Sequence, residues 1–180
     1  MSDFKVASRY ARSVFDLAVE LQKVGNIYRD MQLVQRVSAE NRKLVTLLNN
    51  PIIRYDFKLR VLTRIFEKHV DPLTIKFFNL IARKNRASVL PEVSRVFLDL
   101  YDEHMGIVRA SVTSAVALTD QIKKEFEELV AKETGKKVEM ETTIDESMLG
   151  GYVLRVGDKQ IDDSLKTKLN NLRRELKHRH

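Results

Sequence analysis

The period of the hydrophobic pattern changes near Gly106, and this change limits the folds open to the 180-residue chain. Before Gly106, apolar residues recur every three or four positions, which is typical of amphipathic helices. After Gly106, β-branched residues roughly alternate with polar ones, which is typical of strands. The sequence therefore predicts an α+β protein, with a helical domain over residues 1–105 and a smaller α/β domain over residues 106–180.

The first region is predicted to be a six-helix bundle with short connections. Gly25-Asn26 is expected to end the first helix, and Asn49-Asn50-Pro51 breaks the chain further on. Asp71-Pro72 is typical of a helix start, with Asp as the cap and Pro in the first turn. The expected helices cover residues 4–23, 27–37, 41–48, 55–69, 72–84 and 89–101.

Two of these helices carry more apolar residues than a simple surface helix needs. On a helical wheel, the first has one stripe through Tyr10, Val14 and Leu17 and a second stripe beside it that contains Phe15. The segment 73–84 is the most apolar of this region. Packing against two neighbours in the bundle explains such a pattern. So does one stripe that faces the core while the other receives a partner.

The second region is predicted to follow the order strand, helix, strand, strand, helix. The expected strands cover residues 107–116, 137–144 and 152–156, and the helix between the first two covers residues 120–134. Thr119 is expected to cap the middle helix and Gly135 to end it. Gly157-Asp158 suits a turn, and Asp162 or Asp163 is expected to cap the last helix. That helix carries a leucine stripe at coiled-coil spacing. The stripe consists of Leu165, Leu169, Leu172 and Leu176.

Signals for catalysis are weak. Gly150-Gly151 lacks the spacing of a phosphate-binding loop, and its glycines are better explained as a bend before a strand. The chain has no cysteine, and none of its four histidines pairs with another His or a carboxylate at HExxH-like spacing. His178 and His180 are better explained as solvated terminal residues than as metal ligands. The sequence therefore predicts no catalytic residue, no cofactor and no metal site.

The net charge of +7 favours acidic partners, which include nucleic acid, anionic lipid and acidic proteins. Basic residues crowd the last helix, as in a protein that neutralises phosphates. Stacking aromatics are absent from that helix, and the leucine stripe favours an apolar protein partner instead. No apolar run approaches the length of a transmembrane helix.

Three motifs, in order along the chain, resemble those of the delta subunit family of F-type ATP synthases, whose mitochondrial homologue is the oligomycin-sensitivity-conferring protein. Residues 10–18 resemble its YAxAxFxxA opening, with Ser13 where Ala is usual, and residues 85–91 resemble its NxRxxxLP segment, with Asn85 directly before Arg86. Residues 149–164 resemble its GG…RxGDxxxDxS signature. The signature residues are Gly150, Gly151, Gly157, Asp158, Asp162 and Ser164.

The resemblance implies a non-catalytic stator subunit of the peripheral stalk, which links the catalytic head to the b subunits so that proton-driven rotation is coupled to ATP synthesis. It implies that the first and fifth helices hold the N-terminal helix of an alpha subunit and that the C-terminal leucine stripe contacts the b subunits. The residues expected in the alpha-binding groove are Tyr10, Val14, Leu17, Phe77, Leu80 and Ile81.

The resemblance also implies one copy of the chain in a hetero-oligomeric complex. The expected location is peripheral, on the cytoplasmic side of the bacterial inner membrane. A basic, helical nucleic-acid-binding protein is the alternative.

Overall fold

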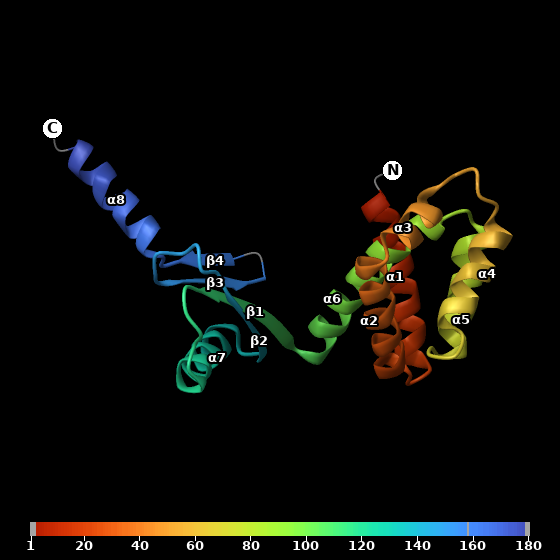
Figure 1. The fold of residues 1–180 in the computed structure, drawn as a ribbon. Helices are drawn as coiled ribbons and strands as arrows, with labels where there is room; N and C mark the ends of the chain where they lie inside the picture. Colours follow the sequence, from red (N-terminus) through yellow and green to blue (C-terminus); the bar gives the residue numbers. More distant parts are fainter. Residues whose placement is uncertain (1–2, 158, 179–180) are drawn as a thin grey trace. The chain divides into compact units, whose positions relative to one another are not determined.

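A computed structural model describes residues 3–157 and 159–178 of the chain (Figure 1). The fold is α+β, as predicted, with helices first and a mixed sheet after them. The chain divides into two compact units, Met1–Asp102 and Glu103–His180. Within the described residues, none of the helices combines the length and the apolar composition required to cross a bilayer.

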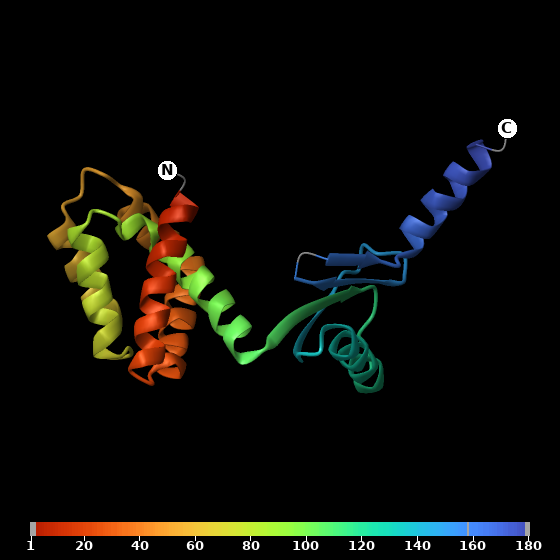
Figure 2. The same ribbon diagram turned by 180° about the vertical axis from the view of Figure 1, so that it is seen from behind.

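The N-terminal unit contains the predicted helices, which pack around one apolar core (Figures 1 and 2). Phe66, Phe78 and Phe97 are among its largest fully buried side chains. The elements are α1 (Asp3–Glu20), α2 (Val24–Glu40), α3 (Arg42–Asn49), α4 (Tyr55–Phe66), α5 (Pro72–Arg83), the short 3-10 helix η1 (Ala87–Val89) and α6 (Leu90–Met105).

The end of α1 differs from the prediction. The helix ends at Glu20, and Gly25-Asn26 lies inside α2. The stop is made by Gln22, whose φ of 55° is left-handed, and the N–H group of Lys23 donates to the carbonyl oxygen of Ala18 at 2.8 Å. This is the Schellman ending that glycine usually completes. Because glutamine occupies the left-handed position here, the sequence does not mark the stop.

The C-terminal unit is a four-stranded sheet in the order β2-β1-β3-β4. Strands β1 and β2 are parallel, and α7 forms the crossover between them, whereas β3 and β4 add as antiparallel strands. Val130 of α7 packs against Ala110, Val112 and Leu154 of the sheet. The elements are β1 (Ile107–Ser114), α7 (Asp120–Thr134), β2 (Lys137–Ile144), β3 (Tyr152–Val156), β4 (Lys159–Asp162) and α8 (Leu165–His178).

Strand β4 was not predicted. All of its residues are exposed, so no alternation of buried and exposed positions marks it in the sequence. Backbone pairing holds it on β3, with Val156 opposite Lys159. Gly157 has a left-handed φ of 56° at the predicted turn between the two strands. Asp158, the other expected turn residue, lies outside the described residues.

Candidate partner-binding surfaces

An open apolar groove of about 270 Å³ lies between α1 and α5, which run beside each other in both views of the fold (Figures 1 and 2). Its floor contains Val14 and Phe77, which are 7% and 4% exposed. The ring of Tyr10 meets the ring of Phe77 edge-on, with centroids 6.4 Å apart. The lining residues are Tyr10, Ser13, Val14, Leu17, Leu73, Lys76, Phe77 and Leu80.

The groove has two leucines that the N-terminal unit leaves partly uncovered. Leu17 on α1 is 40% exposed, and Leu80 on α5 is 48% exposed. Ser13 adds no unpaired donor, because its hydroxyl donates to the carbonyl oxygen of Arg9 at 2.9 Å. An apolar floor with exposed leucines suits the apolar face of an amphipathic helix.

The packing of α1 follows from its two apolar stripes. Ala7, Ala11 and Ala18 have no exposed surface, and these small residues bring the helix close to the core. The neighbouring stripe, which includes Val14 and Leu17, then lies along the groove. Of the two explanations left open by the sequence, the structure contains the arrangement in which one stripe faces the core and the other borders an open groove.

A polar network fixes the start of α5. Asp71 caps the helix by accepting a hydrogen bond from the N–H group of Leu73 at 2.9 Å, and its carboxylate pairs with Lys23 Nζ at 2.9 Å. The bond from Leu73, followed by that from Lys23, holds the pKa of Asp71 below its usual value. The carboxylate of Asp30, which is buried in α2, accepts the hydroxyl of Thr74 at 2.6 Å and the N–H group of Asp71 at 2.8 Å. These contacts tie α5 to α2 and so help to set the position of the groove.

Five of the six residues expected in the groove line it, and Ile81 does not. Ile81 is 0% exposed and belongs to the core, because it lies about 100° around α5 from Leu80. The structure adds Leu73 to the lining, a residue that the sequence marks by its position one turn before Phe77. It also adds Ser13 and Lys76.

The glycine pair of the C-terminal signature forms the joint at which α8 begins. The N–H group of Leu165 donates to the carbonyl oxygen of Gly150 at 3.0 Å. Gly151 has a φ of 84°, and a Cβ atom there would lie 2.4 Å from the carbonyl oxygen of Asp163. Only glycine tolerates this approach without strain. The pair therefore allows close backbone packing, as expected for a bend.

The cap of α8 is Ser164 and not Asp162 or Asp163. The hydroxyl oxygen of Ser164 accepts the N–H group of Thr167 at 3.3 Å. Asp162 accepts the N–H group of Ser164 at 3.0 Å and the hydroxyl of Thr167 at 2.9 Å, and these bonds, led by those from Ser164, lower its pKa. Asp163 pairs with Lys168 Nζ at 2.8 Å. The prediction placed the cap one or two residues too early because Asp is a good capping residue and Ser follows it directly.

The predicted leucine stripe begins on the exposed surface of α8. Leu165 and Leu169 are 46% and 59% exposed, and their spacing of four residues places them on one face. Leu172 and Leu176 lie within α8, but their side chains are outside the part of the chain that the structure describes. The described start of the stripe is therefore available to a partner.

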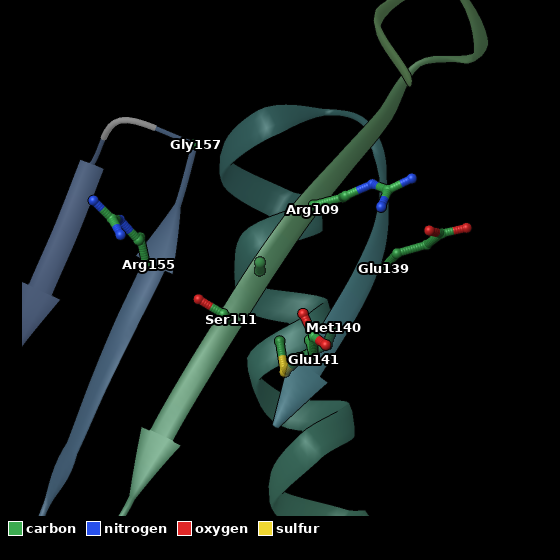
Figure 3. A pocket seen from close by; sticks show the side chains of 8 residues that line it. Arg109, Ser111, Glu139, Met140, Glu141, Arg155 and Gly157 are labelled. Atoms are coloured by element: carbon green, nitrogen blue, oxygen red, sulfur yellow. The ribbon is translucent and has the colours of Figure 1, made fainter. Parts of the chain in front are cut away.

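A second hollow, of about 550 Å³, lies over the sheet of the C-terminal unit (Figure 3). Its side chains come from neighbouring positions of β1, β2 and β3, with Arg109 opposite Glu139 and Ser111 opposite both Glu141 and Arg155. This face carries charges of both signs, with Glu139 and Glu141 on β2 and the two arginines on β1 and β3. Among the described residues, no three His, Cys, Asp or Glu side chains cluster closely enough to hold a metal ion.

An open apolar groove and an exposed leucine-bearing helix are typical of an adaptor protein that docks to other chains. The chain belongs to the ATP synthase delta (OSCP) subunit family, which it matches over residues 6–176. It is therefore a non-catalytic component of the peripheral stalk of an F-type ATP synthase. This confirms the resemblance drawn from the three motifs.

Bacterial delta subunits cover nearly the whole chain. The ATP synthase subunit delta of Chlorobaculum tepidum is 36% identical over 176 residues, covering 98% of this chain and 97% of that protein. The subunit of Amoebophilus asiaticus is 34% identical over 175 residues, covering 97% of this chain and 95% of that protein.

A solved structure shares the fold. A chain in the cryo-EM structure of the Toxoplasma gondii mitochondrial ATP synthase hexamer aligns with a TM-score of 0.70 at 17% identity. The alignment covers 94% of this chain and 96% of that one.

Proposed function

We propose that this subunit ties the catalytic head to the stalk, with residues 1–105 holding the N-terminal helix of an alpha subunit and residues 106–180 contacting the b subunits. The observation that carries the proposal is the open apolar groove between α1 and α5. Its exposed leucines are suited to the spaced apolar anchors of an amphipathic helix.

The work of such a subunit is mechanical. Rotation of the central shaft applies torque to the head, and the stator resists it so that proton flow drives ATP synthesis. A static clamp needs buried anchors. Each large apolar side chain that becomes fully buried contributes about 1.5–3 kcal/mol before the costs of association. The floor formed by Val14 and Phe77 is already packed, so the groove is shaped before the partner arrives.

The C-terminal contact rests on α8. Leu165 and Leu169 are exposed on one face, and helices of a stalk are suited to pack on such a stripe by coiled-coil geometry. We include Leu172 and Leu176 in this surface on their spacing alone. The Gly150-Gly151 joint orients the start of α8 for this contact.

We further propose that one copy of the chain sits in the hetero-oligomeric complex, on the cytoplasmic side of the bacterial inner membrane. The support is membership of the family together with the bacterial relatives. The nucleic-acid alternative rested on charge, and family membership gives it no support.

The test is a titration of the full-length chain with a synthetic peptide that carries the N-terminal segment of the alpha subunit from the same enzyme. Tyr10→Asp places a carboxylate beside Phe77 and is expected to weaken binding strongly. A thermal melt of the variant verifies that the bundle is intact. Unchanged affinity in a folded Tyr10→Asp variant contradicts the groove assignment.

The stalk contact is tested by affinity capture of the tagged chain from solubilised membranes. Recovery of both alpha and b subunits with the wild-type chain is expected. Leu169→Asp should lose the b subunits and keep the alpha subunit. Loss of both subunits, or of neither, contradicts the division of roles between the two regions.

A further inference from the structure

The α5 side of the groove carries a cation that the fold does not use. Lys76 is the charged member of the described groove lining, and its side chain is exposed. It borders the groove because Leu73 and Leu80, its neighbours at i−3 and i+4 on α5, line the groove as well. Among the described residues, no carboxylate forms an ion pair with it.

A second cation continues the same rim. Arg83 lies seven residues after Lys76, which is nearly two full turns, so it projects from the same side of α5 about 10 Å further along the axis. Arg83 is also exposed and also has no ion-pair partner among the described residues. We call Lys76 and Arg83 the cationic lip.

The α1 side of the groove carries charges of both signs. The polar face of α1 beside Ser13 carries Arg9 together with Asp16 and Glu20, all exposed. A helix in the groove therefore meets a positive flank along α5 and a mixed flank along α1. This asymmetry distinguishes the two sides of a bound helix.

We propose that the cationic lip selects an amphipathic helix with carboxylates beside its apolar stripe, on the flank that faces α5. Because the two helices rise equally per residue, two acidic residues about seven positions apart match Lys76 and Arg83. The proposal rests on the proposed function, since it concerns the same groove and adds the charge pattern and rotational setting of the occupant. Rim charges of this kind act on association rate and partner choice more than on total affinity.

The experiment measures association and affinity of the full-length chain for the alpha N-terminal peptide, at low salt and at 1 M NaCl. Lys76→Glu should slow association by about three- to tenfold at low salt. The difference should almost vanish at 1 M, where charges are screened beyond about 3 Å. Arg12→Glu is the matched control, because it makes the same charge change on an exposed part of α1 turned away from the groove. It should change association less than twofold.

A charge-swapped peptide gives the decisive reading. Replacing the flanking acidic residues of the peptide by lysine should weaken binding to the wild-type chain and restore it to Lys76→Glu. Equal effects of Lys76→Glu and Arg12→Glu, or no rescue by the swapped peptide, overturn the cationic lip.

The two proposals fail in different ways. If Leu80→Ala weakens binding while Lys76→Glu has no effect, the groove assignment is supported and the role of the cationic lip is contradicted. If the wild-type chain binds none of the peptides, both the groove assignment and the role of the cationic lip are contradicted.

Discussion

Truncating Leu80 tests the groove most directly. Leu80 is 48% exposed in the free chain, so about half of its side chain remains to be buried by a partner. Full burial of a leucine contributes about 1.5–3 kcal/mol, and half of this is about 0.7–1.5 kcal/mol. Leu80→Ala should therefore raise the Kd for the alpha N-terminal peptide by about three- to twelvefold.

The assay is fluorescence anisotropy with a labelled peptide and the full-length chain, at one fixed salt concentration. Ile65→Ala is the matched control, since Ile65 is 39% exposed on α4 and does not line the groove. It removes a similar apolar group and should leave the Kd unchanged. Equal weakening by both variants, or none by either, would refute the reasoning that the groove receives the helix.

Three further perturbations have defined outcomes. Gly151→Ala should destabilise the C-terminal unit in urea denaturation, because the added Cβ meets a carbonyl oxygen. Gly25→Ala, inside α2 with open space around it, should be neutral or stabilise the protein by up to about 1 kcal/mol. Equal urea midpoints for the two variants would contradict the close approach at Gly151. Thr74→Val removes a donor from the buried Asp30 carboxylate and should cost about 1.5–3 kcal/mol in urea unfolding, so an unchanged midpoint would exclude this bond as a support of α5. Because the pKa of Asp162 is lowered in the folded chain, its support of the α8 cap is complete above about pH 3.9 and is lost as the pH falls through the lower folded value. The NMR chemical shift of the Ser164 amide should follow this loss in a pH titration. Asp162→Asn should abolish this pH dependence of the amide shift.

Local sequence patterns were enough to predict much of the fold. The strands β2 and β3 have the predicted bounds, and Thr119 and Gly135 bound α7 as expected. These features depend on side-chain alternation and on capping chemistry, both of which are visible within a few residues of sequence.

Features that depend on backbone contacts alone escaped prediction. The exposed strand β4 is held by pairing with β3, and no burial pattern marks it. The turn after α1 uses Gln22 in a left-handed conformation that glycine usually takes. Strand β4 depends on its partner strand, and the turn at Gln22 depends on local backbone hydrogen bonds that no residue type marks in the sequence.

Part of the groove could be predicted from the sequence, and part depends on the tertiary structure. The sequence by itself determined that α1 has a second apolar stripe and that the segment of α5 is rich in apolar residues, because angular spacing within a helix follows from helical geometry. Only the tertiary structure decided that these surfaces face each other and stay open, with Leu80 in the groove and Ile81 in the core. A helical wheel gives angles within one helix, but packing against the other helices sets which of those angles point inward.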